Sequence, residues 1–179
     1  MPARFVENIL YAAPMHDVGK IGIPDNILLK PGKLTGEEFE VMKTHPTIGA
    51  KILANSRGEI LKFAQQIAVS HHEKWNGKGY PVGHTGEKIP IVGRIVALAD
   101  TFDALTSRRP YKDPYPVDTA LDIIKKERGE HFDPDVVDVF LKNINEIIAI
   151  FQELFLPWIK KLPSESVFLC SPLRLIEVP

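Results

Sequence analysis

Imidazole and carboxylate side chains occur at four places in this sequence where an apolar segment would otherwise continue. A buried ionisable group is costly unless it is paired or bound to a metal, and Asp100 follows the apolar run Ile-Val-Ala-Leu-Ala. Nitrogen and oxygen ligands without thiolate favour iron, manganese or zinc. Together these groups predict a centre for divalent cations. The candidate ligands are His16, Asp17, His45, His71, His72 and Asp100.

Each candidate also has a simpler explanation when it is considered alone. His45 would be a hydrogen-bonded core histidine, and Asp100 would be the partner of an arginine such as Arg94. The first doublet would be a polar pair at a helix end, and the second would be one buried and one solvated imidazole. Six such groups on the inner faces of one small helical domain are hard to satisfy separately, which favours a shared centre.

The spacing of the ligands favours more than one ion. Adjacent residues on a helix point roughly 100° apart, because a helix has about 3.6 residues per turn. His71 and His72 therefore suit two neighbouring ions better than one. We favour Asp17 as a carboxylate shared between two ions, which lie about 3.5–4 Å apart in two-metal hydrolases.

The composition describes one water-soluble domain. Of 179 residues, 44% are hydrophobic and 25% are charged, and this length is enough for one domain with a core and too short to expect two. The formal net charge of −1 gives no overall attraction to nucleic acid or anionic lipid. We therefore expect no DNA partner, and any anionic ligand must be held by a local cluster of cations.

Cysteine content and hydropathy indicate the compartment. Cys170 is the single cysteine, which excludes an internal disulfide and a cysteine-rich zinc site and suits a reducing cytoplasm. The first ten residues carry a charge every few positions, unlike a secretory signal. The longest apolar run, residues 147–159, is interrupted by Gln152 and Glu153 and is too short to span a bilayer. We expect a cytoplasmic protein without membrane insertion.

Helical periodicity dominates the chain, and no alternating strand pattern stands out. Pro14 is expected to kink the first helix, Thr35 and Glu38 form a capping box, and Asp133 caps a helix with Pro134 at its first position. This pattern predicts an all-α bundle of about six to seven helices over residues 1–150, followed by a helix end and an irregular tail over 151–179. The helices are expected over residues 5–18, 37–45, 47–56, 59–75, 92–107, 117–128 and 133–148.

Four segments carry a resemblance to a known family. The segments HDVGKIGIPD, HHEKWNGKGYP, RIVALADTFDALTSRRPYK and GEHFDP occur in this order between residues 16 and 134. They resemble the HD-GYP family of cyclic di-GMP phosphodiesterases, a branch of the HD-type metal phosphohydrolases, over roughly residues 5–145. The resemblance implies an HD-domain-like helical fold with two or three divalent metal ions. Iron or manganese is expected first, with zinc, nickel or magnesium as alternatives.

The resemblance also implies roles for individual residues. His16 and Asp17 correspond to the doublet that names the HD fold, and the other four candidate ligands fall on the family's later ligands. Asp17 and Lys20 are the expected catalytic residues, with Lys20 acting beside a bridging water. The substrate-binding residues implied by the family motifs are Gly79, Tyr80, Pro81, Arg109 and Lys112.

The physical chemistry of these groups agrees with such roles, and simpler readings remain open. Arg109 offers a planar fork to a phosphate and Lys112 a point charge, while Tyr80 could stack on a guanine. The segment RRPYK could instead be a solvated turn, and NGKGYP a tight loop that needs glycine at positive φ. We expect His84 and His131 to have no ligand role.

The N-terminal end departs from the family pattern. HD-type centres usually take a further histidine, and in this family often a glutamate, from a helix upstream of the doublet. Only 15 residues precede His16, and none is histidine. The sequence therefore looks like a domain truncated at its N-terminus, without the upstream receiver or sensor domain that often precedes it. A missing apolar helix would expose core surface and favour a homodimer.

The expected function is metal-dependent hydrolysis of cyclic di-GMP to linear pGpG, and on to GMP, in bacterial second-messenger signalling. The alternative is a truncated, catalytically impaired module that binds nucleotide or partner proteins, such as a diguanylate cyclase domain, without turnover. A third reading keeps the metal chemistry and changes the substrate to another nucleotide or phosphate ester. The glycine-rich loop and the basic segment RRPYK argue against the third reading.

Overall fold

The computed structural model describes residues 1–107 and 113–159, and these residues form helices, turns and loops without a strand. The all-α fold class predicted from the sequence is confirmed. Short 3₁₀ turns lie at Ala13–Met15, Val18–Gly22 and Gly86–Lys88. The nine α-helices of the described ranges are α1 (Ala3–Ala12), α2 (Asp25–Leu28), α3 (Gly36–Met42), α4 (His45–Ile52), α5 (Glu59–Ser70), α6 (Ile91–Thr106), α7 (Val117–Lys126), α8 (Pro134–Lys142) and α9 (Ile144–Ile159).

Two helix starts form as the local sequence dictates. The side chain of Thr35 accepts a hydrogen bond from the amide of Glu38, and the Glu38 carboxylate accepts one from the amide of Thr35, which completes the predicted capping box. The Asp133 carboxylate caps α8 by accepting from the amide of Asp135, with Pro134 at the first helical position.

All seven predicted helices are present, and several of their ends differ from the prediction. The first α-helix ends at Ala12 rather than residue 18, because Pro14 lies in the following 3₁₀ turn and cannot continue the α-helical hydrogen bonding. The helix predicted over 133–148 is interrupted at Asn143, whose side-chain amide donates to the carbonyl of Val139. The short helix α2 lies inside a predicted loop. Helix α9 extends to Ile159, into the range 151–179 where a helix end and an irregular tail were predicted; residues 160–179 lie outside the described part of the chain.

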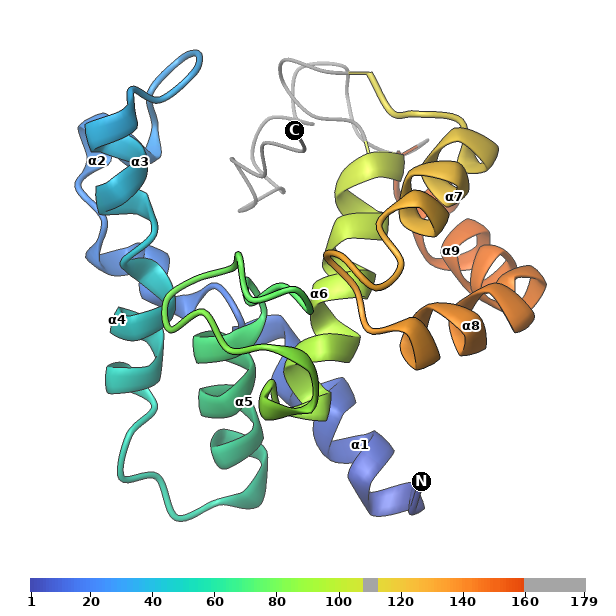
Figure 1. The fold of residues 1–179 in the computed structure, drawn as a ribbon, viewed down its shortest axis with the longest axis horizontal. Helices are drawn as coiled ribbons and strands as arrows, with labels where there is room; N and C mark the ends of the chain where they lie inside the picture. Colours follow the sequence, from blue (N-terminus) through green and yellow to red (C-terminus); the bar gives the residue numbers. More distant parts are fainter. Residues whose placement is uncertain (108–112, 160–179) are drawn as a thin grey trace.

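Helix α6 joins the two main halves of the core. Val92 and Val96 pack in a cluster with α1 and α5, whereas Leu98, Phe102 and Leu105 pack in a second cluster with α7 and α8. A third, smaller cluster joins α2 and α3. In Figure 1, α6 accordingly lies between the α1–α5 part and the α7–α9 part of the molecule. Residues midway along α6 therefore lie where both halves meet.

The 3₁₀ turn after the HD doublet packs directly on α4. A Cβ atom added at Gly19 would overlap the carbonyl oxygen of His45 and the amide nitrogen of Gly49. The two backbones therefore approach more closely than any side chain would allow. This contact holds the segment with Asp17 and Lys20 against the start of α4, where His45 lies.

Replacing Gly19 by alanine is expected to lower the free energy of unfolding by about 3 kcal/mol, because backbone must move to admit the methyl group. Denaturant unfolding followed by circular dichroism measures this change. Gly36→Ala is the matched control, since no atom lies within 4 Å of the added Cβ, and it should be neutral or slightly stabilising. Equal stability of the two variants would show that the turn and α4 are not tightly packed.

Candidate metal centre

The chain brings the predicted metal ligands together from four separate segments. His16 and Asp17 lie between two 3₁₀ turns, and His45 is the first residue of α4. His71 and His72 follow the end of α5. One ligand atom from each of Asp17, His45, His71 and His72 lies within 4.8 Å of the others. These four residues form a group of side chains able to hold a metal ion.

The remaining two predicted ligands lie beside this group. The Nε2 atom of His16 is 3.3 Å from Oδ2 of Asp17 and 3.7 Å from Oδ1 of Asp100. Asp100 comes from the middle of α6, so the cluster joins α6 to the N-terminal segment. Arg94, the alternative partner considered for Asp100, bonds through its guanidinium to Asp133 at 2.6 Å.

Three of the imidazoles are oriented by backbone carbonyls. Nδ1 of His16 is 2.8 Å from the Ala13 oxygen, and Nδ1 of His45 is 2.8 Å from the Met42 oxygen. Nδ1 of His71 lies 3.1 Å from the carbonyl oxygens of both Ile67 and Ala68 near the end of α5. A carbonyl accepts only from a protonated nitrogen, so each Nδ1 carries a hydrogen, and the neutral form of each ring presents its lone pair at Nε2. This is the tautomer and orientation that metal-ligating histidines adopt.

The lone pairs point into the protein without a partner. The Nε2 atoms of His16, His45 and His71 and the Oδ1 atom of Asp17 are buried, and none has a hydrogen-bond partner among the described residues. Buried polar atoms are normally hydrogen-bonded, and leaving four unsatisfied in one place is expensive. Divalent cations would satisfy all four, so the donor set fits the metal centre that the sequence predicts.

The two oxygens of Asp17 face different sets of groups. Oδ1 lies 3.2 Å from Nε2 of His45 and 3.8 Å from Nε2 of His71. Oδ2 lies 2.7 Å from Nζ of Lys20 and 3.3 Å from Nε2 of His16. A carboxylate placed in this way has one oxygen available to each of two adjacent ligand sets.

The protonation states also suit a metal. Burial lowers the pKa of His71 to about 3, so that its imidazole is neutral at physiological pH. Burial opposes ionisation of Asp17, but its contacts with His16 and His45 and the charge of Lys20 hold its pKa well below the usual range. The cluster therefore offers an ionised carboxylate next to a neutral imidazole, the forms in which these groups bind metals.

The side chains of His71 and His72 do not point to two different ions, as their spacing on a helix predicted. Helix α5 ends at Ser70, so His71 and His72 lie in the turn that follows and not on the helix. Their ring centroids are 4.0 Å apart, and both rings belong to the group around Asp17. The His71 ring lies over the last turn of this helix, where its Nδ1 contacts the carbonyl oxygens of Ile67 and Ala68.

The Gly-Tyr-Pro segment lies directly against this centre. The Tyr80 ring stacks on His72, with centroids 4.7 Å apart and planes inclined by 23°. Burial, and then the charges of Asp17 and Asp100, raise the pKa of the Tyr80 phenol. Gly79 and Pro81 flank it, and the Tyr80–Pro81 peptide bond is cis. Arg109 and Lys112, the two predicted phosphate-binding cations, lie outside the described residues.

The comparison with protein families decides the affiliation. A family model described as HD domain matches residues 1–136. This chain belongs to the HD domain family. The family prediction made from the sequence motifs is thereby confirmed.

The HD domain also has close curated relatives. It is 54% identical over 152 residues to a cyclic di-GMP phosphodiesterase of Thermotoga maritima, covering 85% of this chain and 41% of that protein. It is 52% identical over 151 residues to a cyclic di-GMP phosphodiesterase of Vibrio cholerae, covering 82% of this chain and 31% of that protein. The chain thus spans less than half the length of these relatives.

A solved structure supports the fold alone. The crystal structure of the cyclic GMP-AMP specific phosphodiesterase V-cGAP3 of Vibrio cholerae matches with a TM-score of 0.58 and 22% sequence identity, covering 81% of this chain and 39% of that chain. The HD-domain-like arrangement of helices predicted from the sequence is confirmed by this match.

One residue of the HD domain that sequence reasoning missed is Glu73. The residue is 2% exposed, and its carboxylate accepts hydrogen bonds from the backbone amides of Val82, Gly83 and His84 at 2.8–3.2 Å. Its position directly after the two histidines was a signal, because a carboxylate there is either a ligand or the anchor of a neighbouring loop. The structure shows the second arrangement.

The segment GEHFDP fastens α7 and α8 of the HD domain to the turn after the histidines. The amides of Trp75 and Asn76 donate to the carbonyls of His131 and Glu130 at 3.0 and 2.9 Å, and Asp133 binds Arg94 of α6. The His131 ring is stacked on Phe132 rather than directed at the metal group. This motif therefore acts as a structural connection.

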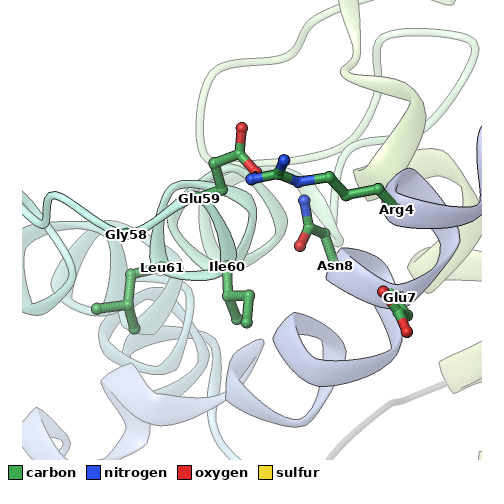
Figure 2. A pocket seen from close by; sticks show the side chains of 7 residues that line it. All are labelled: Arg4, Glu7, Asn8, Gly58, Glu59, Ile60 and Leu61. Carbon is green, nitrogen blue, oxygen red and sulfur yellow. The ribbon is translucent and has the colours of Figure 1, made fainter.

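A separate cavity of about 650 Å³ lies between α1 and the start of α5. Figure 2 shows the exposed ion pair of Arg4 and Glu59 at its edge, with an N–O distance of 2.7 Å, and such surface pairs contribute little. None of the predicted site residues lines this cavity, so we assign it no part in the chemistry. Its lining residues are Arg4, Glu7, Asn8, Gly58, Glu59, Ile60 and Leu61.

A membrane-spanning helix is not found in the described part of the HD domain, because none of these helices combines the required length with sufficient apolar character.

Proposed function

We propose that this HD domain is a metal-dependent phosphodiesterase that hydrolyses a cyclic dinucleotide, with cyclic di-GMP as the first candidate substrate. The observation that carries the proposal is the set of buried, unpartnered lone pairs on His16, His45, His71 and Asp17. Two relatives more than 50% identical to the chain are named cyclic di-GMP phosphodiesterases, which supports the substrate class. Linear pGpG is the expected first product, and GMP is the product of a second hydrolysis.

Two or three divalent ions are proposed to occupy the site. His45, His71 and His72 would hold one ion, and His16 with Asp100 a second, with Asp17 shared between them. When bound, divalent cations acidify a water molecule into a nucleophile near neutral pH and neutralise charge on the phosphate. The absence of thiolate ligands favours iron or manganese, with zinc, nickel or magnesium as alternatives.

Lys20 is proposed to act beside the reacting phosphate. Its side chain is buried, and its Nζ donates to Oδ2 of Asp17 at 2.7 Å. This contact fixes the orientation of the Asp17 carboxylate and places a positive charge at the edge of the ligand cluster. A positive charge held there in a dry site stabilises negative charge that develops on phosphate oxygens during hydrolysis.

Arg109 and Lys112 are proposed to bind the substrate phosphates, and Tyr80 with Gly79 and Pro81 to shape the adjacent wall. The observed stacking of Tyr80 on His72 supports a place for this loop next to the reacting groups. Because the net charge of the whole chain is −1, binding of an anionic dinucleotide must depend on such local cations.

Lys112→Ala is expected to raise the KM for cyclic di-GMP about tenfold while leaving bound metal and kcat close to those of the parent chain, because loss of a phosphate contact weakens binding. Steady-state kinetics and metal analysis of the same samples measure both quantities. Lys126→Ala, which removes a lysine from the last turn of α7, is the control. An unchanged KM in Lys112→Ala would remove Lys112 from the substrate site.

We also propose the bounds of the domain, the compartment in which it acts and its partners. The domain is proposed to cover residues 1–150 and to act in the cytoplasm, where cyclic dinucleotides signal. An upstream receiver or sensor domain, a diguanylate cyclase domain and a second copy of the chain are the proposed partners.

The decisive experiment for the function is a turnover assay with iron or manganese on cyclic di-GMP, cyclic GMP-AMP and an unrelated phosphodiester. The proposal expects metal-dependent formation of pGpG. Nucleotide binding measured by calorimetry without any product, in the presence of bound metal, would contradict it and select the non-catalytic binding module.

A further inference from the structure

His72 is held in the metal group in a different way from the other histidines. The rings of His16, His45 and His71 are oriented through Nδ1 by backbone carbonyl oxygens. The His72 ring is instead enclosed by other rings, with centroids 5.0 Å away at His45 and 4.7 Å away at Tyr80. Its rotamer therefore depends on ring packing, and the nearly parallel ring of Tyr80 covers one of its faces.

Tyr80 is fixed in this position by its own contacts. Its backbone amide donates to the carbonyl of His72 at 3.1 Å, so the two residues are tied together through backbone as well as rings. Phe39 of α3 contacts the Tyr80 ring edge to face, with centroids 6.4 Å apart. The ammonium group of Lys43 lies 6.0 Å from the centroid of the Tyr80 ring. Helix α3 thus supports the Tyr80 ring, which in turn packs on His72.

The Glu73 carboxylate binds residues 82–84, at the C-terminal end of the loop that carries Tyr80. Oε1 of Glu73 accepts from the amides of Val82 and Gly83, and Oε2 accepts from those of Gly83 and His84. Both oxygens are used, so an amide in place of the carboxylate would set an N–H group against backbone N–H groups. The loop begins after His72, and its far end at residues 82–84 is hydrogen-bonded back to Glu73, the residue next to His72. These bonds close the loop around Tyr80.

The glycine of the motif completes this closure. A Cβ atom at Gly79 would overlap the amide nitrogen of Lys74 and lie 2.5 Å from Cα of Glu73. The loop therefore packs on the backbone of residues 73 and 74 with no room for a side chain. The need for glycine at this position comes from close approach, whereas Gly77 and Gly83 have positive φ values of 79° and 77°.

We propose that Glu73 and Tyr80 are positioning residues that fix the His72 imidazole for metal binding, with Glu73 acting through the loop and Tyr80 through ring stacking. The inference rests on the proposed metal centre. Groups that orient a metal ligand typically change metal affinity by about 10–100-fold when they are replaced. A purely structural loop would alter stability and leave the affinity of the folded chain unchanged.

Cobalt(II) titration of the full chain, followed by visible absorption, tests the proposal. We expect Tyr80→Ala and Glu73→Gln each to weaken cobalt binding about tenfold, and Tyr80→Phe to restore the affinity to within about twofold, because it keeps the stacked ring. Tyr11→Ala, at a residue of α1 that is 61% exposed, and Glu87→Gln, at an exposed residue of the same loop, are the matched controls with unchanged affinity.

Two results separate failure of this inference from failure of the proposed function. If the parent chain binds cobalt and Tyr80→Ala and Glu73→Gln bind it equally well, the positioning role is wrong and the metal centre stands. If the parent chain binds no cobalt, the metal centre is wrong and the inference falls with it. Thermal unfolding of each variant identifies misfolded samples, and the isosteric Glu73→Gln variant provides the answer if Tyr80→Ala does not fold.

Discussion

Asp17→Ala is expected to remove bound metal and to lower the turnover of cyclic di-GMP by about 10³-fold. The reason is the position of its carboxylate, with Oδ1 facing His45 and His71 and Oδ2 facing His16 and Lys20. Without this carboxylate, the two ligand sets lose their shared group and the charge that compensates a cation. Metal analysis of the purified variant and a turnover assay measure the two losses.

The same measurements on two other variants control this prediction. Asp100→Ala should also lose metal, because its carboxylate lies 3.7 Å from Nε2 of His16. His84→Ala should keep its metal, because His84 is exposed and contributes its backbone amide to the Glu73 carboxylate. Equal metal content in all three variants would refute the ligand assignment.

Lys20→Met is expected to lower kcat by about 10²-fold while most of the metal remains bound. Methionine preserves much of the length of the side chain and removes the charge that lies 2.7 Å from Oδ2 of Asp17. The histidine and carboxylate donors remain, so the metal affinity should fall much less than the rate. Single-turnover kinetics on metal-loaded protein separate the chemical step from metal binding.

Lys30→Met is the matched control, because Lys30 forms an ion pair with Glu38 that is partly open to solvent. It should leave kcat unchanged. If Lys20→Met loses metal in proportion to activity, Lys20 supports the site only by holding Asp17. An unchanged kcat would exclude Lys20 from the reaction altogether.

The helical fold was predictable because its signals are local. The capping box of Thr35 and Glu38, the cap at Asp133 and the apolar periodicity of α6 each depend on residues within a few positions. The helix ends near Pro14 and His71 were predicted too far along the chain. At the first of these ends, Pro14 lies in the following 3₁₀ turn and stops the α-helical hydrogen bonding before the apolar pattern ends.

The candidate site was predictable in its residue types and less so in its arrangement. Burying six ionisable groups in one small domain requires that they meet, and the structure brings them together. The role of Glu73 could not be read from the sequence, because its partners are backbone amides, which have no residue identity. The stacking of Tyr80 on His72 likewise depends on a loop closure that periodicity does not reveal.

Anomalous diffraction from crystals of this chain soaked with manganese shows directly whether the ligand group around Asp17 holds metal ions. We expect an anomalous peak bounded by Oδ1 of Asp17 and the imidazoles of His45, His71 and His72, and a second peak between Asp17, His16 and Asp100. Ordered crystals with intact side chains and no peak in this group would contradict the metal centre, and the phosphodiesterase proposal would be withdrawn with it.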